Sequence, residues 1–215
     1  QAWFHTDAVQ TYGLLPIDVE ADHIDMLSTS AHKINGPKKI GFLYRRRGVN
    51  FPSLIKGGDQ EEKRRAGTEN VPAAAAFAKA VEALTPDEKK KRQERFYGFQ
   101  QQLVDGLKKN GVDFEVNGKV EPGDLEHVIN LWIKGVSSAV LQTNMDLSGV
   151  ALSGGSACTA GSLEPSHVLT AMFGPDSPRL SESIRISFGA VNTESQVDQL
   201  VTKLSAVANR LQKEE

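Results

Sequence analysis

The sequence predicts an α/β protein built from two parts, because the pattern of the chain changes at residues 71–85. Before this region, short strand-like runs alternate with turns, and little helix is expected. After it, helical and strand-like segments alternate, each with its own apolar face. We therefore place residues 1–75 in one domain and residues 86–215 in a small α/β domain, with a connector helix over residues 76–85.

The strands predicted for the first part follow from short runs of apolar residues bounded by turn formers. These runs are residues 3–5, 24–28, 40–44 and 52–55. Asn35-Gly36-Pro37 is a strong turn signal between the second and third runs. A charged, Gly-containing loop is expected over residues 61–70, and an Ala-rich helix from Val71 to about Leu84.

The helices predicted for the second part begin at capping sequences. Thr85, followed by Pro86 and Glu88, is typical of a helix start, and Gly111 is a stop signal. The apolar face of this helix consists of Phe96, Phe99, Leu103 and Leu107. Thr193 and Gln196 form a second capping box, which begins the last helix. Its apolar face consists of Val197, Leu200, Val201, Leu204, Val207 and Leu211.

The remaining elements of the second part are shorter. Helices are expected over residues 137–147 and 166–173. Strands are expected over residues 112–116, 127–133, 150–152 and 183–188.

The composition fits a soluble globular protein, with 39% hydrophobic and 24% charged residues in a chain of 215. No apolar run is long enough to span a bilayer, so we expect no membrane partner. The net charge of −2 gives no general electrostatic support for nucleic-acid binding. A single cysteine excludes an intrachain disulfide and a Cys-x-x-Cys metal site. We expect no bound metal and a reducing, cytoplasmic location.

Lys33 is the first candidate functional residue. It follows an apolar run, and Ser30 and His32 beside it are able to bind a phosphate. The rigid turn over residues 35–37 would hold the amine still. These features favour a lysine that forms a Schiff base with pyridoxal phosphate. Most lysines are solvated surface groups, and that interpretation stays open at this point.

Asp7 is the second candidate, because pyridoxal phosphate also needs an acidic partner for its pyridinium nitrogen. It follows the strand-like run at residues 3–5. A turn residue or a helix N-cap is at least as common a role for such a carboxylate. Gln10, three residues further on, would donate to the ring oxygen of the cofactor.

Cys158 lies in a segment of small residues, with Gly154 and Gly155 before it and Gly161 after it. So many small residues favour an exposed loop that carries a thiol to its target. Two alternatives stay open. The segment also fits a tight phosphate-binding turn, and a Cys-His hydrolase would use His127 or His167 as its base.

Arg185 lies between two isoleucines in a predicted strand. Its guanidinium either lies on the solvent face or reaches a carboxylate, and these two interpretations have equal weight. Bidentate binding of an amino-acid carboxylate is the chemistry that arginine performs best.

Taken together, these segments resemble the cysteine desulfurases of the NifS/IscS kind, which are pyridoxal-phosphate enzymes of aminotransferase class V. The resemblance extends over essentially the whole chain. Its motifs are His5-x-Asp7-Ala8-x-Gln10, Ser30-x-His32-Lys33, Gly57-Gly58-x-Gln60-Glu61 with Arg65-Ala66-Gly67-Thr68, Ser156-Ala157-Cys158-Thr159 with Leu163-Glu164-Pro165-Ser166, and Ile184-Arg185-Ile186-Ser187. The cysteine loop is similar to that of group I of the family. The resemblance implies the C-terminal part of a fold type I transferase, with a remnant of its large parallel-sheet domain and its small α/β domain.

The resemblance also implies roles for the cofactor-binding residues. Lys33 would form the Schiff base and later move a proton. Asp7 would pair with the pyridinium nitrogen and Gln10 with the ring oxygen, while Ser30 and His32 would hold the phosphate.

Three further residues gain roles in the same way. Thr68 would reach the phosphate of a second subunit, which implies a homodimer. Arg185 would bind the carboxylate of L-cysteine. Cys158 would take the sulfur as a persulfide, with release of alanine, and pass it to a scaffold or sulfur-acceptor protein for iron–sulfur clusters or thiolated tRNA.

Members of this family are nearly twice as long as this chain. The half without a counterpart here would supply a Gly/Thr phosphate loop, a His stacked on the cofactor and an Asn near the substrate. The chain also begins without methionine, in the apolar run Gln1-Ala2-Trp3-Phe4, which is typical of a chain that has lost its beginning or was made as a piece. We expect poor or no activity unless another chain provides the missing half.

Two other classes of function stay open. One is a different enzyme of the same fold, either a selenocysteine lyase or an aminotransferase, and the Cys158 loop speaks against the aminotransferase. The other is an inactive fragment or a non-enzymatic domain that binds a partner.

Overall fold

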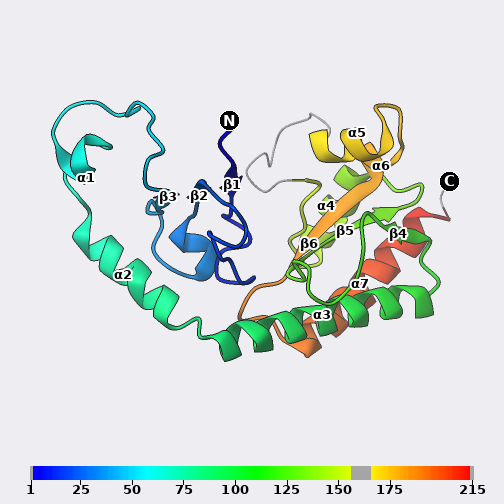
Figure 1. The fold of residues 1–215 in the computed structure, drawn as a ribbon. Coiled ribbons are helices and arrows are strands. Elements are labelled where there is room, and N and C mark those ends of the chain that lie inside the picture. The colour runs from blue at the N-terminus through cyan, green and yellow to red at the C-terminus, as the bar shows by residue number, and fades with distance from the viewer. Residues whose placement is uncertain (1, 156–165, 214–215) are drawn as a thin grey trace. The chain divides into compact units, whose positions relative to one another are not determined.

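The computed structural model describes residues 2–155 and 166–213 (Figure 1). The chain forms two compact units, Gln1–Lys91 and Arg92–Glu215. The boundary between them falls inside α3 (Pro86–Lys109), a few residues after the predicted connector. The assignment of separate roles to the two parts stays a prediction.

The first unit contains a small mixed sheet with the order β1-β2-β3. Its strands are β1 (His5–Asp7), β2 (Met26–Ser28) and β3 (Leu43–Arg45). β1 and β2 run parallel, whereas β3 is antiparallel to β2. One face of the sheet covers a core in which Ala8, Ile24 and Leu27 are buried. The predicted strands at residues 3–5, 24–28 and 40–44 are therefore present, in shorter form or shifted by a few residues.

A short 3₁₀ helix, η1 (Ala31–Ile34), follows β2, although the sequence did not predict it. Ala31 and Ile34 are buried against Phe77 and Leu84. Asn35 ends this helix in the left-handed conformation, with φ of 65°, which asparagine tolerates better than most residues. Apolar packing thus fixes η1 on the helix that follows later in the chain.

That later helix is α2 (Val71–Glu82), as the sequence predicts, and the Asn70 side chain caps its first turn. The charged loop before it contains only the short α1 (Gln60–Lys63), in which Glu61 and Glu62 have positive φ.

The strand predicted at residues 52–55 is wrong, because the structure forms no ladder there. The Ser53 hydroxyl donates to the Ile55 carbonyl at 2.8 Å, which makes a local turn. Leu54 is 95% exposed. A strand needs a neighbour that takes up its backbone groups, and in the described part of the chain none lies beside this run.

The second unit contains an antiparallel sheet with the order β4-β5-β6. Its strands are β4 (Phe114–Val116), β5 (Val128–Ile133) and β6 (Ser183–Ser187). Its helices, besides α3, are α4 (Ser138–Leu147), α5 (His167–Phe173), α6 (Arg179–Glu182) and α7 (Glu194–Leu211). α6 is too short to leave a periodic signal and was not predicted.

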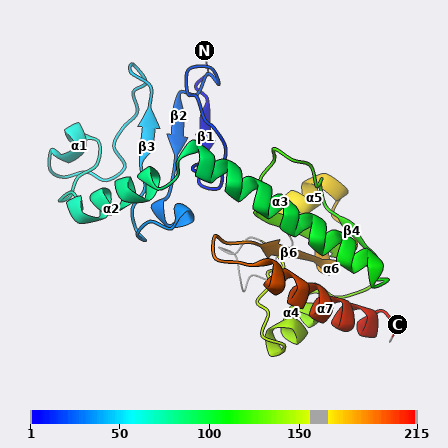
Figure 2. The same cartoon turned by 90° about the horizontal axis from the view of Figure 1, so that it is seen from below.

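α3 and α7 lie side by side against the sheet (Figure 2). The closest approach is at Gly106, where an added Cβ would lie 2.6 Å from the Val201 side chain. The four residues predicted for the apolar face of α3 are all buried. On α7 the first four predicted residues are buried, but Val207 and Leu211 are only partly so, because Ala208 takes the buried position in the last turns.

The capping box predicted at Thr193 forms, and the Thr85 hydroxyl caps the start of α3. Gln196 N–H donates to the Thr193 hydroxyl, and the Gln196 side chain accepts from Thr193 N–H at 3.2 Å. Glu88 N–H donates to the Thr85 hydroxyl at 3.2 Å. Gly111 ends α3 with φ of 70°. These contacts satisfy backbone groups that a helix end would otherwise leave unpaired.

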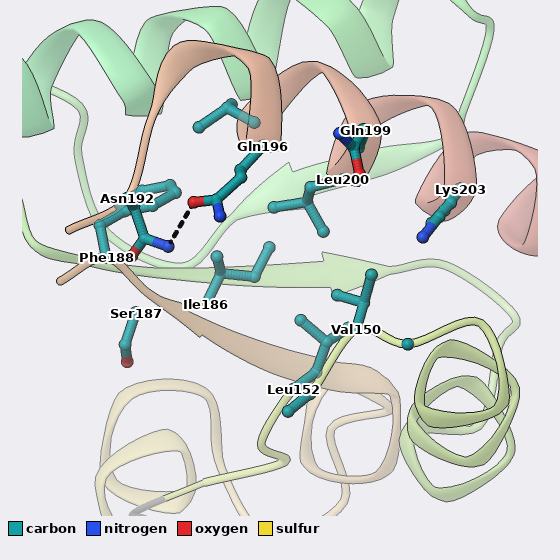
Figure 3. Close-up of a pocket in the computed structure, with 13 residues that line it drawn as sticks. Val150, Leu152, Ile186, Ser187, Phe188, Asn192, Gln196, Gln199, Leu200 and Lys203 are labelled. Carbon is teal, nitrogen blue, oxygen red and sulfur yellow. Dashed lines mark hydrogen bonds between the residues drawn. The ribbon is translucent and has the colours of Figure 1, made fainter.

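The strand predicted at residues 150–152 is wrong. Among the described residues, the pairing near it is a bridge between Ser153 and Arg185, and residues 150–152 line a pocket together with residues of β6 (Figure 3).

None of the helices in the described ranges is long and apolar enough to cross a membrane. Within the same ranges, no cluster of three or more His, Cys, Asp or Glu side chains is arranged to hold a metal ion.

Burial on α3 gives a first stability prediction. Leu103 is fully buried and Leu147 is 83% exposed. Leu103→Ala should therefore lower the free energy of unfolding by about 2–5 kcal/mol through loss of packing, while Leu147→Ala should change it by about 0.5 kcal/mol or less. Urea unfolding followed by far-UV circular dichroism checks both. Equal losses from the two variants would contradict this packing.

Glu115 gives a second prediction. Lys134 and Arg179 donate to its carboxylate and hold its pKa below the ordinary value. A carboxyl whose pKa is lower in the folded state stabilises that state above its ordinary pKa, and the contribution is lost as the pH falls through the folded pKa. Stability should therefore fall more steeply below about pH 4.5 in the parent chain than in Glu115→Gln. Thermal melts from pH 7 to 3 measure this, and parallel curves for both proteins would rule it out.

Candidate functional site

The parallel pair β1–β2 brings predicted site residues to one edge of the sheet. Asp7 ends β1 directly opposite Ser28, which ends β2. The Ala8 N–H donates to the Ser28 carbonyl at 2.9 Å and continues the pairing by one residue. Ser30 and η1 follow immediately. Ligands in α/β folds bind outside the carboxyl ends of parallel strands, and the candidate residues from both strands lie at that end.

Asp7 is exposed and presents one carboxylate oxygen to its own turn. Its Oδ1 accepts from Val9 N–H at 2.9 Å. This is the contact expected of a turn residue, which was the alternative role considered for Asp7. No contact in the described residues involves its Oδ2. The turn bond orients the side chain, and the second oxygen is available to a ligand.

The burial pattern of η1 decides where Lys33 and His32 point. Ala31 and Ile34 face the core, so the two residues between them are exposed. Among the described residues, none forms a hydrogen bond or ion pair with the Lys33 ammonium. The backbone of Lys33 is held by a bond from its N–H to the Ser30 carbonyl at 3.2 Å. The amine is thus a free group on an anchored backbone.

Ser30 and His32 lie together, with 2.7 Å between the Ser30 hydroxyl and His32 Nδ1. Ser30 precedes η1 with an extended backbone and does not cap it. A hydroxyl and an imidazole next to each other form a pair of donors suited to phosphate oxygens. The sequence predicted that both residues bind a phosphate, and that role stays a prediction; their contact with each other is a finding of the structure.

One further contact at this edge was missed by sequence reasoning. His5 Nε2 and the Ser28 hydroxyl are 2.8 Å apart. His5 and Asp7 occupy positions i and i+2 of β1, so they point to the same face of the sheet. That spacing was the available signal, but the partner strand could not be identified without the register.

Gln10 and Thr68 occupy exposed positions in the same unit. Gln10 lies in the turn after β1. Thr68 lies in the loop before α2, where Gly67 N–H donates to Gln60 Oε1 at 3.0 Å. No contact in the described residues joins Thr68 to Lys33 or Asp7, so its assignment to a second subunit stays a prediction.

Arg185 belongs to the second unit and lies on β6 opposite Asn130. Its backbone pairs with Ser153, whose N–H donates to the Arg185 carbonyl at 3.2 Å. The side chain is half-buried, and its Nε is buried and has no hydrogen-bond partner within residues 2–155 and 166–213. Buried donors of a charged group are normally paired. The buried Nε disfavours the interpretation that the Arg185 guanidinium lies on the solvent face, and it is compatible with binding of an anion.

Cys158 falls within residues 156–165, which lie outside the described residues. The segment that leads to it is held by Ser153, whose hydroxyl donates to the Gly155 carbonyl at 2.8 Å. At Gly154 an added Cβ would lie 2.8 Å from the Gln142 side chain. A Cys-His pair with His127 or His167 therefore stays untested.

A model of the aminotransferase class-V family matches residues 1–200 of the chain. This chain belongs to that family. Its similarity within the family is to cysteine desulfurases of the IscS/NifS kind. Enzymes of this family use pyridoxal phosphate.

Two relatives illustrate the similarity. A Bacillus subtilis (strain 168) protein, named provisionally as cysteine desulfurase IscS 1, is 53% identical over 98% of this chain and 55% of its own length. A Sinorhizobium fredii protein named cysteine desulfurase is 42% identical over 98% of this chain and 54% of its own length. The chain therefore spans about half the length of the relatives that it matches.

Solved structures give the same result. A structure titled NifS-like protein superposes with a TM-score of 0.82 and 32% identity, covering 96% of this chain and 52% of that one. A NifS-like protein from Rickettsia africae also gives 0.82, with 28% identity over 96% of this chain and 54% of that one. The α/β fold predicted from the sequence, as about half of such an enzyme, is confirmed.

Proposed function

We propose that this chain carries the cofactor lysine, the substrate-binding arginine and the sulfur-accepting cysteine of a cysteine desulfurase. The observation that carries the proposal is the meeting of Asp7, Ser30 and Lys33 at the carboxyl ends of β1 and β2. Family membership supports pyridoxal phosphate as the cofactor at this edge of the sheet. The names of the relatives support L-cysteine as the substrate.

The side chains at this edge fit pyridoxal phosphate group by group. The free Lys33 amine suits the aldehyde, and the second oxygen of Asp7 suits the protonated ring nitrogen. Ser30 and His32 suit the phosphate, and Gln10 would donate to the ring oxygen. When bound, the cofactor would act as an acceptor for the electrons of the bond that breaks next to the substrate nitrogen. The carboxylate of Asp7 would keep the ring protonated and so strengthen that effect.

Arg185 would bind the substrate. Its buried, unpaired Nε matches the carboxylate of L-cysteine, and a charge-assisted bond in a partly buried position is strong and directional. The bridge to Ser153 ties this arginine to the segment that leads to Cys158. One short stretch of the second unit would thus hold the substrate and present the thiol.

Sulfur transfer would use two groups of this chain. The Cys158 thiolate attacks the substrate sulfur, so that an S–S bond forms and the C–S bond breaks. The electron pair of the broken bond stays on carbon, which takes a proton to become the methyl group of alanine. Lys33 would deliver the proton, and Cys158 would be left as a persulfide for a sulfur-acceptor protein.

The complete site is proposed to need more polypeptide than this chain. It spans about half of its relatives, and Thr68 would serve the phosphate site of a second subunit in a homodimer. We therefore expect the chain alone to bind the cofactor weakly and to turn over poorly. Supply of sulfur to iron–sulfur clusters or thiolated tRNA would follow from the completed enzyme.

The cofactor site is tested by absorption. Incubation with pyridoxal phosphate should give a yellow band, and borohydride followed by peptide mapping should fix the label on Lys33. Lys33→Ala should lose both, whereas Lys38→Ala, on the neighbouring exposed turn, should keep them. Label spread equally over surface lysines in the parent chain would count against the site.

The sulfur chemistry is tested after addition of the half of the Bacillus subtilis relative that this chain does not match. The mixture should release alanine from L-cysteine. Cys158→Ala should slow this by about 100-fold or more, because the nucleophile is lost. Arg185→Lys should mainly raise KM, because bidentate binding of the carboxylate is lost. Full turnover by the Cys158 variant would point instead to an aminotransferase or another lyase of this fold.

A further inference from the structure

The sheet of the second unit has one face that packs on α7 and an opposite face that is rich in polar side chains. Figure 3 shows that Ile186 on β6 points towards α7, whereas Ser187 points away from it. Successive side chains of a strand alternate between the two faces, so Arg185 lies on the same face as Ser187. The strand register places further polar side chains on this face. They are Glu115, Asn117, Asn130 and Ser183.

Asn130 on β5 is the cross-strand neighbour of Arg185. Arg185 exchanges its backbone bonds with Ser153, on the outer side of β6. The Asn130 carbonyl accepts from Asn117 N–H at 2.9 Å, on the other side of β5. The two residues therefore form a pair without backbone bonds to each other, and opposite side chains are closest in pairs of this kind. The Asn130 amide thus lies next to the Arg185 side chain.

A chain of hydrogen bonds determines which way the Asn130 amide is turned. Arg179 Nη1 donates to Asn117 Oδ1 at 2.5 Å. A guanidinium only donates, so the amide oxygen of Asn117 has to face it. The Nδ2 of Asn117 is then left to donate to Asn130 Oδ1 at 2.6 Å and to the Ser183 hydroxyl at 2.8 Å. The charge of one arginine therefore sets the direction of two amides.

Arg179 is itself held in place on several sides. Its guanidinium lies 4.3 Å from the Trp132 ring and 4.4 Å from the Phe173 ring. It also pairs with Glu115, and its side chain is only 15% exposed. A guanidinium that is stacked on aromatic rings and paired with a carboxylate has little freedom to turn. The first link of the chain of hydrogen bonds is therefore rigid.

The amide nitrogen of Asn130 is the donor that this chain of hydrogen bonds leaves over. The oxygen and nitrogen of an amide point apart, so Nδ2 is turned towards β6 when Oδ1 is turned to Asn117 on the β4 side. In the described part of the second unit, no acceptor is bound to this Nδ2 or to the buried Nε of Arg185. Two neighbouring donors of this kind need an acceptor, and a carboxylate has enough lone pairs for both.

We propose that Asn130 is a second binding residue for the carboxylate of the substrate, beside Arg185. Asn117 and Arg179 are positioning residues, which keep the amide nitrogen of Asn130 turned to that carboxylate. The inference rests on the proposed function, because that function assigns the carboxylate to Arg185. It adds selectivity, since the NH₂ group of an uncharged carboxamide would meet a donor at Asn130 and lose a hydrogen bond.

The test follows the full chain by NMR without cofactor. Propionate is the probe, because it has the carboxylate but neither the amine nor the thiol of L-cysteine. It should give saturable shifts of the Arg185 Nε–H resonance and of the side-chain amide resonances of Asn130. Propionamide has nearly the same shape without the charge and should shift neither, and sodium chloride at equal ionic strength controls for screening. Equal shifts with propionamide, or shifts at Arg185 alone, would overturn the proposal.

A matched pair of variants isolates the contribution of the amide. Asn130→Ala should weaken propionate binding about tenfold, because one hydrogen bond to a charged group is lost. Asn144 on α4 bonds to the Val140 carbonyl and to Arg210, so Asn144→Ala should bind propionate as the parent chain does. Unchanged affinity in Asn130→Ala, with the shift at Arg185 retained, would overturn this inference and leave the proposed role of Arg185 standing. No shift at Arg185 in the parent chain would overturn both.

Asn117→Asp tests the chain of hydrogen bonds by reversing it. The new carboxylate still accepts from Arg179 and from the Ser183 hydroxyl, but it does not donate to Asn130. The Asn130 amide should then turn round, so that its oxygen accepts from Arg185 Nε–H. Solvent exchange of this N–H should slow without any anion, and propionate binding should fall about tenfold or more. Exchange and affinity equal to those of the parent chain would contradict the positioning role, which a loss of fold, checked by far-UV circular dichroism, would not imitate.

Discussion

The parallel pairing of β1 and β2 is the constraint on which the rest of the first unit depends. Each strand is short and has few ladder bonds, so neither would persist without the apolar core beneath Leu27 and Ala8. The register sets Asp7 against Ser28. A slip of one residue would turn every side chain of β1 to the other face. Burial of one face therefore also determines which polar groups meet at the carboxyl ends.

The second unit relies on a different arrangement, because its sheet is antiparallel and is packed against two long amphipathic helices. Its polar contacts hold the connections between elements. The Arg179 guanidinium lies 4.3 Å from the Trp132 ring and 4.4 Å from the Phe173 ring and pairs with Glu115. The Gln100 amide donates to two carbonyls at the start of β5. Such contacts position β5 and β6, and through them Arg185.

The sequence predicts the long elements well because their signals are local. The capping box at Thr193 and the apolar face of α3 need no knowledge of distant residues. Residues 52–55 and 150–152 were mistaken for strands, since composition alone does not show whether a partner strand is available. The helix η1 was missed because two buried residues, Ala31 and Ile34, are too few for a period.

The same distinction applies to the candidate site. The motif around Lys33 indicated candidate residues that the structure brings to one edge of the sheet, and their roles stay a prediction. The contact between Ser30 and His32 was not predicted, although the two residues are only two positions apart. The His5–Ser28 contact and the unpaired Nε of Arg185 depend on strand register and on burial, which only the folded chain defines. Only the structure therefore identifies His5 as part of this edge and shows that the Arg185 Nε is buried.

The anchoring of η1 has a consequence for natural sequence variation. A helix of this length has almost no stability of its own, so the position of the Lys33 amine depends on how Ala31 and Ile34 fit against Phe77 and Leu84. Substitutions of Phe77 on α2 and of Leu84 just after it would then displace the amine that we propose to bind the cofactor. If Lys33 has the proposed role, selection on that role would also restrict substitutions at Phe77, although α2 contributes no residue to the proposed site.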